Sequence, residues 1–322
     1  MKKIFVTREI PENAISMLRN KGYEVDIYPK DEIISKKKLI RELRKKDYDA
    51  VLCLLTDTID GDVFDAAPKA KIFANYADGY NNIDINEAKR RNIAVTNTPG
   101  VSSLAVAEHA VALMLSLATR LVEGDRFMRD GKYKGWSPMN FIGTDLGGKT
   151  VGLIGVGHIG SKAAYIMKNG FGSKIIYYDV NSNEEVEMKC GAIRKQSVED
   201  VLREADFVSI HVPLLDSTRH LINEARLSIM KPTAFLINTS RGAVVDEIAL
   251  VKALKDGKIR GAGLDVFEFE PEITKGLLKL QNVVLTPHIA SARESVRNEM
   301  ARLAAQNIIE FFETGTPKNK VN

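Results

Sequence analysis

Three polar side chains that could take part in catalysis follow apolar runs in the last third of the sequence. Arg241 comes after "FLINTS", Glu270 after "GLDVFEF" and His288 after "VVLTP". An imidazole exchanges protons near neutral pH, and a nearby carboxylate stabilises its protonated form. A guanidinium binds a carboxylate in two-point contact and polarises an adjacent carbonyl. These residue types together suit proton exchange with the oxygen of a substrate that carries a carboxylate.

Each of these side chains also has an ordinary structural interpretation. Arg241 could lie in an exposed turn, and His288 could begin a helix. Glu270 could belong to an acidic loop with Glu268 and Glu272. The chemical interpretation therefore depends on the elements that would bring the three together.

Short apolar runs alternate with stretches of helical spacing along the whole chain. The strand-like runs are "KIFVT", "YEVDIY", "AVLCLL", "KIFANY" and "IAVTNT", then "KTVGLIGVG", "KIIYYDV", "DFVSIHVP", "AFLINTS", "GAGLDV" and "NVVLTPH". This alternation predicts an α/β protein with two doubly wound, Rossmann-like domains and parallel sheets. Ligands of such sheets bind at the carboxyl ends of the strands, where Arg241, Glu270 and His288 are expected.

The chain has 322 residues, which favours two domains over one. Two X-Pro joints, in "TNTPG" and "LTPH", follow strands and mark the expected boundaries. We predict a discontinuous, flavodoxin-like domain from residues 1–99 plus 290–322, and a Rossmann-like domain from residues 100–289. The latter includes an apolar helix and an arm at about 101–148, extended over 123–149, which we expect to form a homodimer.

Composition excludes several other classes of protein. There are 46 basic and 42 acidic residues, and the basic runs "KKK" and "RKK" are typical of a solvated helix face, so we expect no nucleic-acid partner. Cys53 and Cys190 have no CxxC spacing, which predicts neither a disulfide nor a metal site. Charged residues interrupt the apolar stretch 104–122, and the N-terminal run is short for a signal peptide. A soluble, cytoplasmic protein without membrane contact is expected.

A glycine-rich motif follows one of the predicted strands. Gly155, Gly157 and Gly160 have GxGxxG spacing between an apolar run and a helical stretch, as a dinucleotide fold requires. Asp179 lies nineteen positions after Gly160 (179 − 160), at the end of the next strand. A carboxylate there binds ribose hydroxyls and repels a 2′-phosphate. The three following residues contain no arginine, so NAD (NADH) is favoured over NADP. We therefore expect residues 100–289 to form the NAD-binding Rossmann domain and residues 1–99 plus 290–322 to form the substrate domain.

The ordered set of motifs resembles the D-isomer-specific 2-hydroxyacid dehydrogenases, in their glyoxylate/hydroxypyruvate reductase branch. The motifs are "NYADGYNNIDI", "TNTPGV", "AEHAVALMLSL", "GWSP", "GKTVGLIGVGHIG", "HVPLLDSTRHLI", "INTSRGAVVDE", "GAGLDVFEFEP" and "TPHIAS". The resemblance implies an NAD-dependent oxidoreductase acting on CH–OH groups. Such an enzyme reduces a short 2-oxo acid (glyoxylate, hydroxypyruvate or pyruvate), bound between two domains, to the D-2-hydroxy acid by hydride transfer.

The resemblance also implies residue roles. His288 would be the general acid/base, Glu270 its partner, and Arg241 the residue that binds the substrate carboxylate and keto oxygen. The substrate-binding set is Ala77, Asp78, Gly79, Arg241 and His288. Further cofactor contacts would come from His158, Ile159, His211, Val212, Pro213, Thr218, Thr239, Ser240, Arg241, Asp265 (on the nicotinamide carboxamide), His288 and Ala290. Asp78 departs from the family, which usually has a small apolar residue there.

Related activities remain as alternatives. D-Lactate dehydrogenase stays open because pockets discriminate weakly against one methyl group. Phosphoglycerate dehydrogenase would need further basic residues for a phosphate, and a formate dehydrogenase would be expected to have Gln in place of Glu270. A different class, an NAD-sensing corepressor-like binding protein, shares the fold, and fold alone does not decide function.

Overall fold

The computed structural model describes residues 1–322, which form two compact α/β units. Unit 1 comprises Met1–Ser102 and Ala292–Asn322, and unit 2 comprises Ser103–Ser291. Every strand pairing within the two sheets is parallel. The predicted α/β class with parallel sheets is therefore confirmed. The assignment of one domain to the substrate and one to the cofactor stays a prediction.

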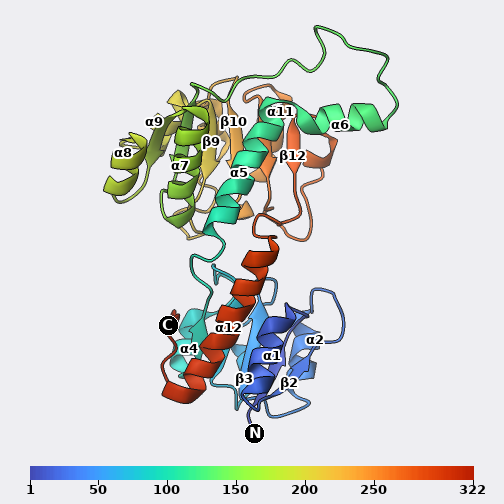
Figure 1. The fold of residues 1–322 in the computed structure, drawn as a ribbon, viewed down its shortest axis with the longest axis vertical. Coiled ribbons are helices and arrows are strands. Elements are labelled where there is room, and N and C mark those ends of the chain that lie inside the picture. The colour runs from blue at the N-terminus through green and yellow to red at the C-terminus, as the bar shows by residue number, and fades with distance from the viewer. The chain divides into compact units, whose positions relative to one another are not determined.

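Unit 1 is built on a five-stranded sheet with the order β2-β1-β3-β4-β5, which is the flavodoxin-like order. Figure 1 labels β2 and β3 of this sheet. Its strands are β1 (Lys3–Val6), β2 (Glu24–Ile27), β3 (Ala50–Leu54), β4 (Ile72–Tyr76) and β5 (Ala94–Thr96). Its helices are α1 (Glu12–Asn20), α2 (Lys36–Leu43), α3 (Gly61–Ala66), α4 (Ile85–Arg90) and α12 (Glu294–Thr314).

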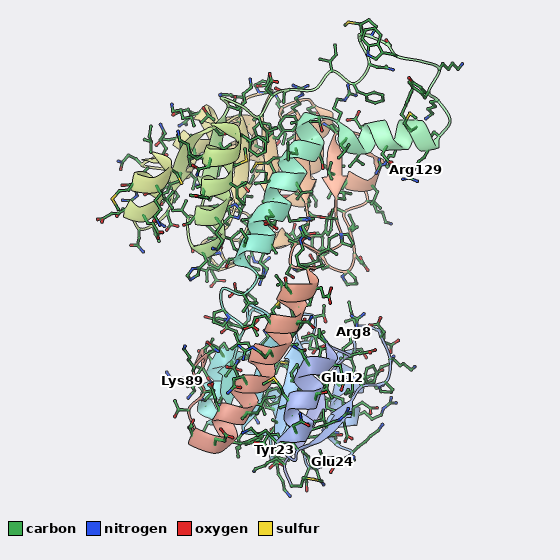
Figure 2. The ribbon with its side chains drawn as sticks, viewed as in Figure 1. Arg8, Glu12, Tyr23, Glu24, Lys89 and Arg129 are labelled. Atoms are coloured by element: carbon green, nitrogen blue, oxygen red, sulfur yellow. The ribbon has the colours of Figure 1, made fainter.

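Side chains of unit 1 alternate between the two faces of its sheet. Ile4 and Val6 pack with α1 and α12, whereas Phe5 packs with α2, α3 and α4. The period of two follows from strand geometry, and it buries both faces of the sheet. Tyr23, labelled in Figure 2, adds an edge-to-face contact with Phe312 of α12, with ring centroids 5.4 Å apart.

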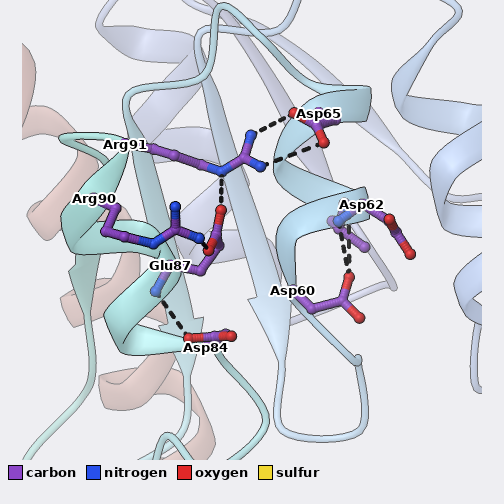
Figure 3. A network of polar contacts seen from close by, with 8 residues as sticks. Asp60, Asp62, Asp65, Asp84, Glu87, Arg90 and Arg91 are labelled. Atoms are coloured by element: carbon purple, nitrogen blue, oxygen red, sulfur yellow. Dashed lines mark hydrogen bonds and ion pairs between the residues drawn. The ribbon is translucent and has the colours of Figure 1, made fainter.

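A network of ion pairs and caps connects α3 with the end of α4 (Figure 3). Asp60 caps α3 by accepting from the amides of Asp62 and Val63. Arg91 pairs with Asp65 of α3 and with Glu87 of α4. Exposed ion pairs contribute about 0–1 kcal/mol each, so the network orients these helix ends more than it stabilises the unit.

Unit 2 is built on a seven-stranded sheet with the order β12-β11-β10-β9-β6-β7-β8. Its strands are β6 (Thr150–Ile154), β7 (Lys174–Tyr178), β8 (Ile193–Arg194), β9 (Phe207–Ile210), β10 (Phe235–Asn238), β11 (Gly261–Leu264) and β12 (Val283–Leu285). Strand order reverses at β6, which lies between β7 and β9. That reversal is the Rossmann arrangement, in which ligands bind beyond the carboxyl ends of the strands.

Helices cover both faces of this second sheet. They are α5 (Ser103–Ala118), α6 (Leu121–Arg129), α7 (His158–Phe171), α8 (Glu184–Cys190), α9 (Val198–Glu204), α10 (Glu224–Ser228) and α11 (Glu247–Lys255), with the 3₁₀ turns η1 (Gly242–Val244) and η2 (Leu277–Lys279). Residues of α5, α7 and α8 share one apolar cluster, and those of α9, α10 and α11 share the other.

The extended arm expected over 123–149 is wrong in its first part, because residues up to Arg129 belong to helix α6 (Figure 2). Arg129 pairs with Asp125 one turn earlier, and Phe127 makes an edge-to-face contact with Phe141. The ion pair between residues four positions apart supports the helix. The homodimer expected through this region stays a prediction.

No single helix has the length and apolar character needed to cross a membrane. Helices α5 and α6 meet those criteria only when they are taken together, and they are bent by 63° where they join.

Candidate active site

Glu270 and His288 form a hydrogen-bonded pair beyond the carboxyl ends of β11 and β12. Nδ1 of His288 lies 3.0 Å from Oε2 of Glu270, and the other carboxylate oxygen accepts from the Phe267 amide at 2.8 Å. Burial raises the pKa of Glu270, but the bond and charge of His288, the Phe267 amide and the charge of Arg241 together lower it below its ordinary value. Glu270 is therefore ionised at neutral pH and can fix the orientation of the ring.

Arg241 lies in the turn between β10 and η1, and Asn238 shapes that turn. The Asn238 side chain donates to the Arg241 carbonyl at 2.9 Å and accepts from the Ser240 amide at 3.0 Å. The guanidinium donates to the Ser240 carbonyl at 2.7 Å. Asn238 is almost fully buried, so the turn has little freedom to change.

The segments that carry Arg241 and Glu270 touch each other. A Cβ atom at Gly242 would lie 1.9 Å from the carbonyl carbon of Phe267, so only glycine fits. Because Gly242 follows Arg241 directly and Phe267 donates to Glu270, the two segments hold their side chains in a fixed relation. The structure thus brings Arg241, Glu270 and His288 to one edge of the unit 2 sheet.

The turn that carries His288 wraps around the buried carboxylate of Asp265. Oδ1 of Asp265 accepts from the Thr286 hydroxyl at 2.6 Å and from the Ile289 amide at 2.9 Å. Oδ2 accepts from the Ala290 amide at 2.9 Å, and the Asp265 carbonyl accepts from the His288 amide at 2.9 Å. His288 itself has φ +54°, a left-handed conformation that costs about 1–3 kcal/mol and persists only where the surroundings fix it.

His109 of α5 reaches the same carboxylate from behind the turn. Its Nε2 lies 3.0 Å from the Thr286 hydroxyl and 3.4 Å from Oδ1 of Asp265. Burial raises the pKa of Asp265, but His109, Thr286 and the two loop amides outweigh it and lower the pKa below its ordinary value. Asp265, expected on the nicotinamide carboxamide, is thus already hydrogen-bonded to the turn, and its contact with a cofactor stays a prediction.

The glycine motif forms the turn between β6 and α7. Gly155 has φ +91°, and a Cβ there would lie 2.9 Å from the His211 carbonyl oxygen. A Cβ at Gly160 would lie 2.1 Å from the Gly155 carbonyl oxygen, whereas one at Gly157 would meet nothing within 4 Å. The first and third glycines are therefore required by packing within the chain. Gly157 is not, and its lack of a side chain suits close approach of a ligand to the helix start.

Two side chains at the same edge have buried polar atoms with no hydrogen-bond partner in the protein. They are His211, at both ring nitrogens, and Thr239, at its hydroxyl. Burial lowers the pKa of His211 to about 4, so its ring is neutral at physiological pH. Buried polar atoms are nearly always hydrogen-bonded, and these follow β9 and β10 directly. Together with the open Gly157 turn, they fit a ligand with many polar groups, such as a dinucleotide.

Asp179 follows β7, and its carboxylate accepts from the Val156 amide at 2.8 Å and the Asn181 amide at 3.3 Å. Arg194 of β8 donates to the carbonyls of Asp179 and Val180 at 3.1 and 3.0 Å. The sequence argument for NAD considered only the residues directly after Asp179. The structure adds an arginine beside that position, so the choice of cofactor depends on more than the carboxylate.

The predicted cofactor residues that remain lie at the starts of helices or in the loops after the strands. His158 and Ile159 begin α7. The Thr218 hydroxyl donates to the Pro213 carbonyl at 2.7 Å, which holds the loop that also contains Val212.

The predicted substrate loop lies in unit 1, after β4. Three of its successive carbonyl groups accept hydrogen bonds from donors of the same unit: Ala77 from the Thr98 amide at 2.9 Å, Asp78 from the Asn97 side chain at 2.6 Å, and Gly79 from the Asn75 side chain at 2.9 Å. In a trans peptide the N–H points opposite to the C=O. The following amides therefore point to the other side of the loop, as anion binding by this loop would require.

The family model of the D-isomer specific 2-hydroxyacid dehydrogenase NAD binding domain matches residues 111–290. A glyoxylate reductase of Korarchaeum cryptofilum is 51% identical over 99% of this chain and 96% of its own length. The chain belongs to the D-isomer-specific 2-hydroxyacid dehydrogenases. A glyoxylate reductase of Thermococcus litoralis is 50% identical over the same shares of the two chains, which places this dehydrogenase in the glyoxylate reductase branch.

Solved structures agree with this placement. A Thermus thermophilus protein, TT0316, is 38% identical with a TM-score of 0.93, over 99% of this chain and 100% of its own. An NADPH-dependent glyoxylate/hydroxypyruvate reductase of Sinorhizobium meliloti, in complex with NADP and malonate, is 32% identical with a TM-score of 0.86, over 99% and 96%. The resemblance predicted from the sequence is confirmed. This dehydrogenase is an oxidoreductase of 2-hydroxy acids that uses a nicotinamide cofactor.

Four residues that shape the site of this dehydrogenase were not identified from the sequence: His109, Arg194, Asn238 and Thr286. Asn238 and Thr286 had a usable signal, because each places a polar side chain at the end of an apolar strand run. His109 and Arg194 had none, since each meets its partner only through tertiary packing.

Proposed function

We propose that this dehydrogenase uses NADH to reduce glyoxylate to the corresponding 2-hydroxy acid. It would reduce hydroxypyruvate and pyruvate in the same way, each to the D-isomer of its 2-hydroxy acid. The hydrogen-bonded pair of Glu270 and His288, beside the charge of Arg241, is the observation that carries the proposal. Relatives about half identical in sequence are named glyoxylate reductases, which supports glyoxylate as the first substrate to test.

The proposed reaction divides the work among the three side chains. Arg241 binds the substrate carboxylate and draws electron density from the keto oxygen. A nicotinamide cofactor held at the turn of Gly155, Gly157 and Gly160 would supply the hydride that C2 of the acid accepts. As the C=O π bond opens, its electron pair moves to oxygen, and His288 gives that oxygen a proton. In the reverse direction His288 accepts the same proton.

Glu270 has a supporting role in this proposal. Its carboxylate bonds to Nδ1 of His288, so Nε2 is the ring nitrogen left to exchange a proton with the substrate. The lowered pKa keeps Glu270 ionised, which stabilises the protonated ring that reduction needs. Loss of the carboxylate would therefore lower kcat for reduction.

For the cofactor, we propose NADH over NADPH. The Asp179 carboxylate at the end of β7 supports NADH, because it would repel a 2′-phosphate. Arg194 could oppose that preference, since its guanidinium already lies on the Asp179 and Val180 carbonyls.

One experiment tests both proposals: loss of reduced cofactor absorbance with a panel of 2-oxo acids, each assayed with NADH and with NADPH. We expect turnover of glyoxylate with a higher kcat/KM for NADH.

Two variants test the proposed roles. His288→Ala should lower kcat by at least ~10²-fold and remove the pH dependence of the acid, and Arg241→Ala should lower kcat/KM by orders of magnitude. Absence of turnover with every acid, or a wild-type pH profile in His288→Ala, would contradict the reaction. Equal kcat/KM values for the two cofactors would contradict only the cofactor preference.

A further inference from the structure

Unit 2 contains a second imidazole–carboxylate pair, His220 with Glu268. Nε2 of His220 lies 2.6 Å from Oε1 of Glu268, whose side chain is only 8% exposed. Glu268 comes two residues before Glu270, in the segment that leads to the proposed active site. This pair is absent from the reaction proposed above, and its position requires another explanation.

The backbone of His220 is bound to the turn that follows Arg241. Its amide donates to the Ala243 carbonyl at 2.8 Å, and the Ile222 amide donates to the Val244 carbonyl at 3.0 Å. His220 has φ +48°, a left-handed conformation that turns its ring and its amide toward different segments. The residue therefore contacts η1 through its backbone and Glu268 through its side chain.

Glu268 is itself fixed, so it gives the ring a rigid partner. Its amide donates to Oε1 of Glu247 at 2.8 Å, and Oε2 of Glu247 accepts from the Thr274 hydroxyl at 2.5 Å. Glu247 is 1% exposed and begins α11. A ring bonded to Glu268 is thus connected to the core of unit 2 and not to a free loop.

We propose that His220 is a positioning residue, which holds the segment of Glu270 against the turn of Arg241. The proposal rests on the proposed roles of those two side chains. Gly242 touches Phe267 without a side chain between them, so a shift of either segment changes the separation of Arg241 from Glu270. Most substitutions of His220 would keep the hydrogen bond of its backbone amide. The specific contribution of the ring is the hydrogen bond to Glu268.

The test is His220→Asn, because asparagine tolerates a left-handed backbone and is too short to reach Glu268. We expect kcat for glyoxylate reduction to fall about 10-fold or more, because small misplacements of catalytic groups have effects of this size. KM should change by less than about 3-fold, since the ring is linked to the Glu270 side and not to the guanidinium. NADH affinity and binding stoichiometry should match the wild type, which excludes a loss of folded protein.

Two further variants make the outcome specific. His220→Gln can still donate to Glu268 and should recover most of the lost kcat. Glu268→Gln keeps the shape of the pair but removes the charge, and it should lower kcat without adding to the loss in His220→Asn. Glu224→Gln is the matched control: it breaks an exposed pair with Lys252, 2.5 Å long, in the same unit, and should leave kcat unchanged.

The proposal would be overturned if His220→Asn had the kcat of the wild type. If His220→Asn does not fold, the same result in Glu268→Gln would overturn it. A loss that His220→Gln does not recover would also overturn it, because the ring would then act by bulk alone. Turnover by the wild-type enzyme keeps this outcome separate from the proposed function. A wild type without activity refutes the reaction, whereas an active wild type with unaffected variants refutes only the role of His220.

Discussion

Asp265 of unit 2 and Asp57 of unit 1 are both buried aspartates that follow a strand, yet their pKa values move in opposite directions. Asp57 accepts from the Thr7 hydroxyl at 2.5 Å and the Leu54 amide at 2.7 Å, both at Oδ2. Burial raises the pKa of Asp57, and these donors with the charge of Arg8 offset it only in part. Asp265 has donors at both oxygens, and its pKa is lowered.

The comparison shows that burial alone does not decide the ionisation of a carboxyl group. Two donors and the charge of Arg8 leave the charged form of Asp57 costly, whereas His109, the Thr286 hydroxyl and two backbone amides together stabilise the charged form of Asp265. The difference matches what each carboxylate holds. Asp265 orders the turn that carries His288, the proposed general acid/base, whereas Asp57 joins two neighbouring strand ends.

Asp265→Asn should have the largest effect. The asparagine side chain keeps only one of the two acceptor oxygens. Its NH₂ group must therefore face a donor, which is either the Ala290 amide or the pair from Thr286 and Ile289. Leaving a buried donor unsatisfied costs about 1–3 kcal/mol, and displacement of His288 should lower kcat about 100-fold. Chemical unfolding and steady-state kinetics measure the two effects.

The pH dependence of that stability loss has a definite sign. The folded-state pKa of Asp265 is below its ordinary value, so its ionised form stabilises the fold above the unfolded-state pKa. This contribution is lost as pH falls through the folded-state value. The gap between wild type and Asp265→Asn should therefore narrow in acid. A constant gap at every pH would show that the charge of Asp265 is not what stabilises the turn.

Thr286→Val should have an intermediate effect. Valine keeps the shape of threonine but removes the hydroxyl that donates to Asp265 and lies 3.0 Å from His109. We expect a loss of about 1 kcal/mol in unfolding free energy and a kcat lowered about 3- to 10-fold, because the two amide donors remain. Unchanged kcat with reduced stability would mean that the turn tolerates loss of one donor without moving His288.

Asp57→Asn should have the smallest effect on the free energy of unfolding, and it should increase it at neutral pH. Both donors bind one oxygen, so an asparagine can keep both bonds while the buried charge is removed. The folded-state pKa of Asp57 is raised, so the wild type is most stable when this group is protonated and loses that contribution as pH rises through the folded-state value. At neutral pH the variant should be more stable, by less than about 1 kcal/mol, and the advantage should vanish in acid.

The activity of Asp57→Asn should equal that of the wild type. If instead it destabilised the protein at neutral pH, the ionised form of Asp57 would be favourable and the contrast with Asp265 would fail.

The fold and the family could be predicted because their signals are local in sequence. Continuous runs such as "AVLCLL" indicate buried parallel strands, and the GxGxxG spacing marks the turn at Gly157 without knowledge of any partner. Strand β8 could not be predicted, since its two residues are exposed and carry no apolar run, and Arg194 was missed with it. The anchoring of the His288 turn by Asp265 and His109 depends on side chains 156 positions apart (265 − 109), which no local pattern encodes.

The tight contact at Gly242 limits how this enzyme can change its substrate. Position 242 admits no side chain, so the segment that carries Arg241 lies directly against the segment that leads to Glu270. Mutations that reshape one of them disturb the other, which makes this edge of the sheet a poor place for evolution or engineering to alter preference. We expect adaptation to a longer or differently charged acid to be easier elsewhere, and the predicted substrate loop with Asp78 is the place to begin a directed-evolution library.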